Sequence, residues 1–214
     1  MNQLLTKTNI FMNNVNIPWA ICGGFAIDLF LKKDIRTHSD IDICVFEKDR
    51  EKILRYMLQN NWNVYEFRGQ GKVRPLNAAS LSETGRNFMC TNGECDIVNF
   101  YPCEEENFLY HEFIHTGIKE FNYVEFLFNI TDEDYFVFDK NQGIKRELSK
   151  EILLNSGIPY LAPEIVLLYK SSWSENVEYQ YDFEQTYWQM NDEQKMWFSQ
   201  NLDVLYSKGH RWKI

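Results

Sequence analysis

The 214-residue sequence lacks the cysteine patterns of a disulfide framework and of a zinc site. It contains five cysteines, an odd number, and no two of them form a CxxC pair. Disulfide frameworks use even sets of cysteines, and structural zinc sites use closely spaced pairs. Most of these cysteines lie in apolar, strand-like runs, where a thiol packs as a small hydrophobic group. We therefore expect reduced thiols and a cytoplasmic protein.

The sequence also lacks a segment that would direct it into or across a membrane. The first residues, MNQLLTKTNIFMNN, have no basic region followed by an apolar run and a cleavage site. No run of residues is long and apolar enough to span a bilayer. We expect no membrane partner.

Basic residues are fewer than acidic residues. The chain has 22 lysines and arginines against 31 acidic residues, a formal charge of -9. This balance disfavours a broad nucleic-acid surface, and it is compatible with a small cationic partner or with ordinary solubility. The hydrophobic content of 44% and the length predict a globular protein of one domain or two small ones.

The order of apolar patterns predicts an α+β fold, with a mixed β-sheet flanked by helices and a helical C-terminal region. Helices are expected near residues 2–14, 25–33 and 49–61, with strands at 18–22, 41–46, 62–67, 87–90, 95–100, 123–128 and 135–138. Further helices are expected at 163–173, 178–189 and 191–206. We predict a catalytic domain over 1–147 and a helical region over 148–214 that packs on it.

Two aspartates interrupt the expected strand IDICVF and the residues before it. Side chains two positions apart in a strand point to the same face, so Asp40 and Asp42 project together. Like charges this close repel unless a cation lies between them, and magnesium prefers carboxylate and phosphate oxygens. Two metals bridged by such carboxylates can activate an attacking oxygen and stabilise a leaving one. The alternative is a pair of aspartates at the exposed start of a strand.

A glycine pair and a third acid extend this pattern. Gly23 and Gly24 stand between an expected strand and helix, where glycine lets a phosphate approach the backbone and the helix N-terminus favours an anion. In GECDIVNF, Asp96 is expected in the middle of an apolar strand, where a charge needs a reason. Glu94 and Glu66 fit the third position less well, because one is at a turn and the other in a more exposed run.

The segments GGFAIDLF and RTHSDIDI resemble the signature of the DNA-polymerase-β-type nucleotidyltransferase superfamily. More narrowly, the chain resembles the small antibiotic nucleotidyltransferases, which include aminoglycoside 2''-adenylyltransferase-like and lincosamide nucleotidyltransferase-like proteins. In that group an aromatic residue commonly follows the glycine pair, as Phe25 does, and a run like Arg36 to Ile43 is typical. The C-terminal segments YLAPEIVLLYKSS and GHRW are also similar to this group.

The resemblance implies that Gly23 and Gly24 line the triphosphate and that Asp40 and Asp42 bind two magnesium ions. It also implies a third acid on a neighbouring strand, as a metal ligand or general base, and Asp96 matches this position by its strand context.

Other residues carry weaker predictions. Arg36 contacts phosphates or holds the loop before the aspartates, and His38 orients that loop. Lys170 reaches the β- or γ-phosphate as a point charge, or it is a solvated helix lysine. FRGQGKVR is expected to form a hairpin with basic flanks. In SENVEYQYDF the chain keeps Asp182 and Phe183 but lacks the Lys-Asp pair that relatives often place before them.

Together these features predict a magnesium-dependent adenylyltransferase that transfers AMP from ATP to a hydroxyl of a small molecule. Alternatives are a toxin–antitoxin-type enzyme that modifies protein or tRNA and a non-catalytic nucleotide-binding module. The acidic balance favours an aminoglycoside acceptor over a lincosamide. Acid clusters at 104–106 and 132–134 would serve an aminoglycoside, and C-terminal aromatic residues would serve a lincosamide. These aromatic residues are Tyr179, Tyr181, Tyr187 and Trp188.

Overall fold

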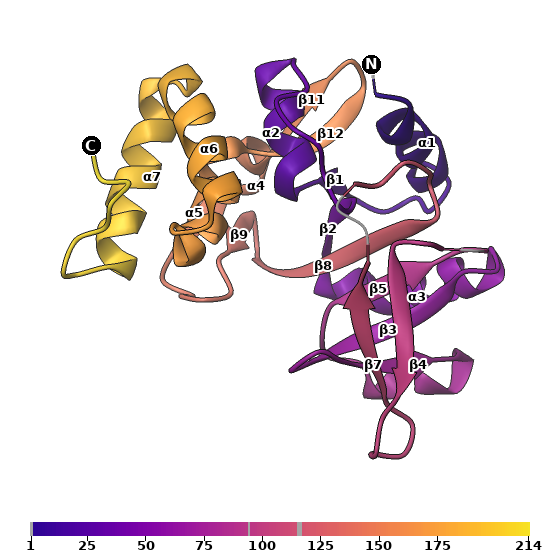
Figure 1. Cartoon of the computed structure of the whole chain (residues 1–214). Helices are drawn as coiled ribbons and strands as arrows, with labels where there is room; N and C mark the ends of the chain where they lie inside the picture. The colour runs from indigo at the N-terminus through magenta and orange to yellow at the C-terminus, as the bar shows by residue number, and fades with distance from the viewer. Residues whose placement is uncertain (1, 94, 115–116) are drawn as a thin grey trace. The chain divides into compact units, whose positions relative to one another are not determined.

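The computed structural model describes residues 2–93, 95–114 and 117–214, and only the backbone of residues 81–83. The fold is α+β with parallel and antiparallel strand pairs, as the sequence predicts (Figure 1). The chain forms two compact units: the first comprises residues 1–19 and 36–129, and the second comprises 20–35 and 130–214. The units interleave along the sequence, and the domain boundary at residue 147 stays a prediction.

The first unit contains a seven-stranded mixed sheet. In spatial order its strands are β2 (Asp42–Phe46), β8 (Tyr123–Asp132), β5 (Phe88–Thr91), β3 (Asn63–Gly69), β4 (Lys72–Leu76), β7 (Leu109–Phe113) and β6 (Val98–Pro102). The helical segments are α1 (Gln3–Met12), η1 (Glu47–Asp49), α3 (Arg50–Gln59) and η2 (Ala78–Glu83). Only β2 and β8 pair in parallel among these described strands, and the last three residues of β8 lie in the second unit.

Helix α3 covers one face of this sheet. Its apolar stripe, Ile53, Leu54 and Met57, is buried, as the helical spacing predicts. Strand β3, which contacts α3, alternates accordingly: Val64 is buried, whereas Tyr65 is only partly covered. The Tyr65 side of β3 is the opposite face of the sheet, and the paired residues Asp42 of β2 and Glu125 of β8 point to that face.

The second unit combines short strands with a helical C-terminal part. Its elements are β1 (Ala20–Ile21), α2 (Gly23–Leu31), β9 (Tyr135–Val137), β10 (Lys145–Glu147), α4 (Leu148–Glu151), β11 (Ile152–Asn155), β12 (Ile158–Leu161), α5 (Pro163–Lys170), η3 (Ser171–Trp173), α6 (Val177–Thr186), η4 (Tyr187–Gln189) and α7 (Asp192–Leu205). Strands β11, β12 and β1 form one small sheet, and β9 joins β10 to the end of β8. Helices α5, α6 and α7 confirm the predicted helices.

The hairpin β11–β12 corrects the expectation that the chain is helical from residue 148. Asn155 pairs with Ile158, so Ser156 and Gly157 form a two-residue turn. Both have positive φ, 52° and 80°, as this type of hairpin turn requires. The leucine-rich run ILLN favours a helix by local propensity, and antiparallel pairing with β12 overrides that preference.

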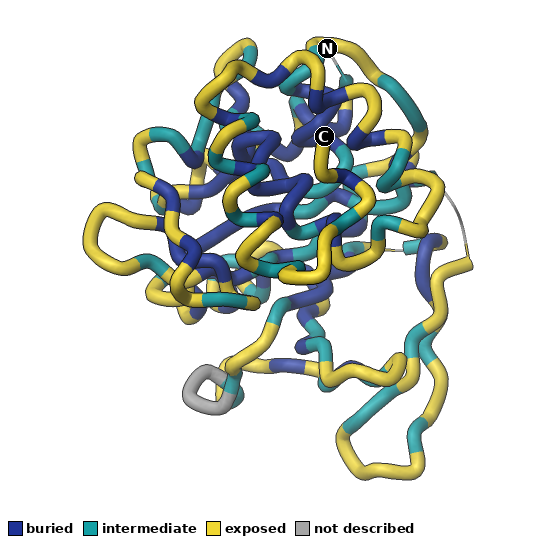
Figure 2. Tube along the Cα trace, turned by 90° about the vertical axis from the view of Figure 1, so that its left-hand side faces the viewer, coloured by how far each residue is buried: buried dark blue, intermediate teal, exposed yellow. Residues whose placement is uncertain are grey.

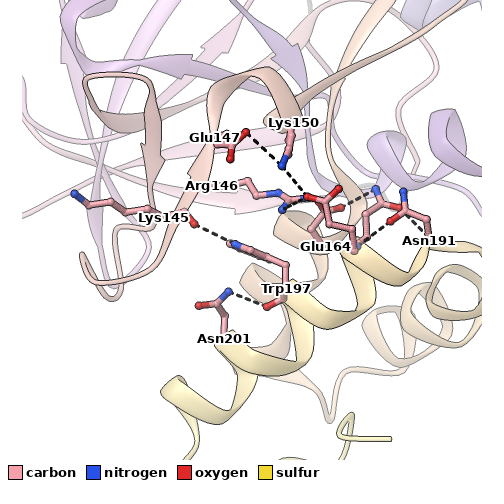
Figure 3. Close-up of polar contacts among 10 residues, drawn as sticks. Lys145, Arg146, Glu147, Lys150, Glu164, Asn191, Trp197 and Asn201 are labelled. Atoms are coloured by element: carbon pink, nitrogen blue, oxygen red, sulfur yellow. Dashed lines mark hydrogen bonds and ion pairs between the residues drawn. The ribbon is translucent and has the colours of Figure 1, made fainter.

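A polar network joins β10 to α5 and α7 (Figure 3). The Arg146 guanidinium donates to the carboxylate of Glu164 at 2.7 Å and to that of Glu193 at 3.2 Å. The Gln194 amide donates to Glu164 at 2.9 Å. Burial raises the pKa of Glu164, and the contacts with Arg146 and Gln194 lower it in part. Because Glu164 is fully buried, these bonds fix α5, the helix that carries Lys170.

Buried residues recur along the trace, alternating with exposed turns (Figure 2). Among the described residues, no helix has both the length and the apolar character that crossing a membrane would require.

Candidate functional site

The glycine pair opens helix α2 directly after strand β1. Gly23 has a φ of 62°, a left-handed conformation that glycine adopts without strain. The preceding Cys22 is extended, and its side chain makes no capping hydrogen bond to the helix. The first N–H groups of a helix lack partners within the helix, and helix N-termini can bind phosphate through them. Contact of Gly23 and Gly24 with a triphosphate stays a prediction.

Three carboxylates gather at β2 and β8 in the first unit. Asp42 is the first residue of β2, and Asp40 precedes it by two positions; both are partly buried. In the parallel pair β2–β8, Asp42 lies opposite Glu125. Paired residues point to the same face, so the Asp42 and Glu125 side chains lie next to each other. The Tyr123 hydroxyl donates a 2.5 Å hydrogen bond to Glu125 Oε1.

The electrostatics of Glu125 reflect this crowding. Burial raises the pKa of Glu125 well above its usual range, and the charges of Asp42 and Asp40 raise it further. The hydrogen bond from Tyr123 opposes that rise in part. Glu125 therefore binds a proton more tightly than an ordinary glutamate, and a cation placed among the three carboxylates would relieve the repulsion.

The carboxylates suit magnesium that arrives with a nucleotide better than a resident metal cage. Among the described residues, no group of three or more His, Cys, Asp or Glu side chains is arranged to hold a metal ion by itself. Magnesium usually takes only one or two protein carboxylates, with substrate phosphates and water as its other ligands. Asp40 and Asp42 fit this requirement, because both are partly accessible and crowded by like charge.

Sequence reasoning missed Glu125 and misplaced Asp96. Strand β6 begins at Val98, so the expectation of Asp96 in mid-strand is wrong: it is exposed, in the segment before β6. A signal for Glu125 was available, because YVEFLF also sets one acid inside an apolar strand. The role of Asp96 as third carboxylate stays a prediction, and Glu94 lies outside the described residues.

Glu66 is a structural carboxylate. It was expected in an exposed run, but it is fully buried on β3. Its carboxylate accepts hydrogen bonds from Arg68 (3.0 Å), Arg74 (2.9 Å) and the backbone N–H groups of Gly85 (2.8 Å) and Arg86 (3.1 Å). Burial alone would raise the pKa of Glu66, but these donors together hold it below its usual value. Glu66 therefore holds the segment before β5 in place.

We expect Glu66→Gln to lower the free energy of unfolding by about 3 kcal/mol, because it leaves the partly buried Arg74 and the more exposed Arg68 without their carboxylate. Urea denaturation measures this loss. The turnover of the folded fraction should stay close to that of the wild type. A variant of normal stability that has lost turnover would instead show that Glu66 takes part in the reaction.

Lys170 is not a solvated lysine. At the end of α5 it is only 7% exposed, and its ammonium group lies 3.0 Å from a carboxylate oxygen of Asp182 and 4.0 Å from the ring centre of Tyr179. Asp182 itself is fully buried. Tyr179 also borders a pocket of about 310 Å³ with Trp173 and Asn176. The solvated alternative is wrong, and a phosphate contact by Lys170 stays a prediction.

We expect Lys170→Ala to lower the free energy of unfolding by about 3 kcal/mol, because the buried Asp182 loses its cation. The double variant Lys170→Ala with Asp182→Asn should lose less than the sum of the losses in Lys170→Ala and Asp182→Asn. If Lys170 also contacts the triphosphate, Lys170→Ala weakens ATP binding more than AMP binding in calorimetry at a temperature where the variant is folded. Equal effects on both nucleotides would leave Lys170 a purely structural role.

Hydrogen bonds to backbone carbonyl oxygens hold the loop before the aspartates. The Arg36 guanidinium donates to the carbonyl oxygen of Thr37 at 3.0 Å. His38 is buried, and its carbonyl oxygen accepts from the N–H of Ile118 at 2.9 Å. The loop-orienting role of His38 and a phosphate contact by Arg36 both stay predictions.

Comparison with known proteins places these features in context. Residues 5–85 match the family model described as aminoglycoside-2''-adenylyltransferase. That range includes the glycine pair and both aspartates, and it ends before β5. No curated protein sequence matches the chain.

Solved structures of two antibiotic adenylyltransferases are similar to the whole chain. The solution structure of the antibiotic-resistance factor ANT(2'')-Ia is 12% identical, with a TM-score of 0.55 over 95% of each chain. ANT(2'')-Ia in complex with adenylyl-2''-tobramycin is 11% identical, with a TM-score of 0.58 over 96% of this chain and 99% of that one. Lincomycin-bound LnuA, a lincosamide antibiotic adenylyltransferase, is 12% identical, with a TM-score of 0.52 over 87% of this chain and 96% of that one. The predicted resemblance and fold class are confirmed.

Proposed function

We propose that this chain is a nucleotidyltransferase that transfers AMP from ATP to a hydroxyl of a small antibiotic-type molecule. The observation that carries the proposal is the pairing of Asp42 with Glu125 on adjacent parallel strands, with Asp40 beside them. An ordinary structural domain has no reason to crowd three carboxylates, because each raises the cost of ionising the others.

Gly23 and Gly24 offer backbone N–H groups of α2 to the phosphates, and α5, which carries Lys170, packs against α2 in the same unit. Asp40 and Asp42 would hold two magnesium ions, which when bound neutralise the charge of the triphosphate and of the departing pyrophosphate. Arg36 is the further candidate for a phosphate contact.

Glu125 acts as the general base. Its carboxylate takes the proton of the acceptor hydroxyl while the hydroxyl oxygen forms a bond to the α-phosphorus of ATP. The bond from that phosphorus to the bridging oxygen breaks, and pyrophosphate leaves. Burial and the charges of Asp42 and Asp40 raise the pKa of Glu125, and a carboxylate with a raised pKa is a stronger base once it is ionised. We assign to Glu125 the role that the sequence predicted for Asp96.

The acceptor is less constrained by sequence than the donor. The family match ends at residue 85, before the strands that carry Glu125, so it supports the donor site rather than the acceptor site. In each acid cluster that favoured an aminoglycoside, one carboxylate already has a cationic partner: Glu105 lies 2.5 Å from Lys72, and Asp132 lies 2.5 Å from Lys145. An aminoglycoside acceptor therefore remains a prediction from the net charge and from the C-terminal resemblance to that branch of the group.

A cytoplasmic location is part of the same proposal. All five cysteines are thiols rather than disulfides, as expected in a reducing compartment.

Mass spectrometry tests the function directly. The protein is incubated with magnesium and each nucleoside triphosphate in turn, with tobramycin or lincomycin as acceptor. We expect the acceptor to gain the mass of AMP with ATP, and pyrophosphate to appear in equal amount. No gain with any combination would contradict the proposal, and modification of the protein itself or of added tRNA would support the toxin–antitoxin alternative.

A further inference from the structure

A row of aromatic side chains leads away from Glu125 in the first unit. Tyr123, which donates to Glu125, has its ring centre 5.8 Å from that of Phe113. Phe113 lies 5.6 Å from His111, and His111 lies 5.7 Å from Phe67, each with an edge-to-face geometry. Phe67, His111, Phe113 and Tyr123 are called the aromatic row below. It is continuous, and one end touches the carboxylate assigned as the base.

The register of the strands puts this row on the face of the sheet that carries the carboxylates. Strand β5 pairs with both β8 and β3, and the register places the Glu125 and Tyr65 side chains on the same face of the sheet. Phe67 follows Tyr65 by two positions in β3 and therefore points to that face as well. Strand β4 pairs with both β3 and β7, and the register places the His111 and Phe113 side chains of β7 on this same face. The residues that alternate with them in β7 point to the opposite face. The row and the three carboxylates therefore share one surface of a single compact unit.

The row presents apolar ring surface to a ligand. Phe113 is 43% exposed, and Phe67 and His111 are partly exposed, so three rings are accessible while Tyr123 is fully buried beneath them. Burial lowers the pKa of His111, which favours the neutral ring at neutral pH. Glu112, between His111 and Phe113, points to the opposite face and accepts a 3.1 Å hydrogen bond from Tyr101.

We propose that the aromatic row is the acceptor-binding surface, with Phe113 as its central contact, and that the acceptor carries an apolar face next to its reacting hydroxyl. The proposal rests on the nucleotidyltransferase function stated above. Phe113 contacts Tyr123, and Tyr123 contacts Glu125. An acceptor that lies on Phe113 would therefore have its hydroxyl directed toward Glu125.

The small number of carboxylates on this face of the sheet favours an acceptor with an apolar face over a polycation. An acceptor with several ammonium groups needs several carboxylates around it, and its binding weakens as salt rises. At the strand positions of this face, the described carboxylates are Asp42 and Glu125, both committed to the reaction. A ring or hydrocarbon face, in contrast, gains from contact with aromatic rings whatever the ionic strength.

The test measures acceptor binding and transfer separately in Phe113→Ala. Lincomycin, with one amine and a large apolar part, and tobramycin, with several ammonium groups, are the two probes. We expect Phe113→Ala to weaken lincomycin binding about tenfold in calorimetry and to raise its KM equally, without changing the KM of ATP. Phe113→Leu, which keeps apolar bulk and packing, should fold normally and lose less. Raising salt from about 0.05 M to about 0.5 M should leave lincomycin binding nearly unchanged.

Trp173→Ala is the matched control, because Trp173 is a 70% exposed aromatic residue that borders the pocket of the second unit. It should leave acceptor binding unchanged. The proposal is overturned if Trp173→Ala weakens binding and Phe113→Ala does not, if wild-type protein fails to bind lincomycin, or if tobramycin is the better ligand with a strong salt dependence. If Phe113→Ala transfers AMP with an unaltered acceptor KM, the nucleotidyltransferase function is retained and the aromatic row is rejected as the acceptor-binding surface. If Phe113→Ala loses lincomycin binding but the wild type transfers no AMP, the aromatic row is retained as a binding surface and the nucleotidyltransferase function is rejected.

Discussion

Substitution of Asp42 by asparagine is expected to reduce AMP transfer by about 10³-fold or more while leaving the fold intact. Asp42 opens β2 opposite Glu125, where an amide cannot balance the charge of a metal–triphosphate complex. Asp40→Asn should behave in the same way. The loss is measured as turnover at saturating ATP and magnesium, with Asp132→Asn, which changes an exposed aspartate paired with Lys145, as the control.

The stability of Asp42→Asn without magnesium should equal or exceed that of the wild type. The pKa of Glu125 is raised in the folded protein by burial, Asp42 and Asp40, so its contribution to stability is full below its unfolded pKa and is lost as the pH rises through the folded value. Removing the Asp42 charge lowers the folded pKa of Glu125 and makes this loss smaller. Thermal unfolding from about pH 4 to pH 9 measures the difference.

With magnesium and ATP the order should reverse, because Asp42→Asn loses the stabilisation that ligand binding gives to the folded state. Unchanged turnover in both Asp40→Asn and Asp42→Asn would remove the metal assignment. Lost turnover together with lost stability at every pH would show a structural defect instead.

Local pattern was enough to predict several helices and strands, including those that carry the proposed donor contacts. Helices α3 and α5 are marked by the spacing of their apolar residues, and strand β2 is marked by an apolar run between charged residues. Each of these signals lies within a few neighbouring residues. The glycine pair marks a turn that only a few residue types can make, and Gly23 indeed has positive φ. Such features need no knowledge of strand order.

The position of Glu125 beside Asp42 depends on strand order, and this is why sequence reasoning did not find Glu125. Both CDIVNF and YVEFLF set one acid in an apolar run, so Asp96 and Glu125 are equivalent by local pattern. Which of them faces Asp42 is decided by β8, a strand some 80 residues later that pairs with β2 in parallel. Pairing between distant strands is not encoded in the periodicity of either strand.

Lys170 shows the same limit for a helix. The charge at the end of PEIVLLYK is typical of a solvated helix terminus, and no local pattern indicates that the fully buried Asp182 lies against it. The ion pair exists because α6 packs on α5, a tertiary contact.

Substitution of Glu125 by glutamine should separate the base from the other carboxylates. We expect kcat to fall about 10²–10⁴-fold, the usual contribution of a general base, with the KM of ATP nearly unchanged. Because glutamine has the shape of glutamate and can still accept the hydrogen bond from Tyr123, the fold should be retained, and the loss of a buried charge near Asp42 should raise the thermal stability. Glu66→Gln, at a buried carboxylate on the same sheet, is the matched control: it should lose stability and keep turnover.

The same kinetics on Asp96→Asn decide between the two candidate bases. Asp96 is exposed before β6, whereas Glu125 lies beside Asp42, so the geometry predicts near wild-type turnover for Asp96→Asn and a large loss for Glu125→Gln. The reverse result would return the proton-accepting role to Asp96. A loss in both variants would mean that the acceptor hydroxyl is approached from two sides, one carboxylate taking the proton and the other orienting the substrate. An effect of Glu125→Gln on ATP affinity alone would make Glu125 a ligand of the triphosphate complex rather than the base.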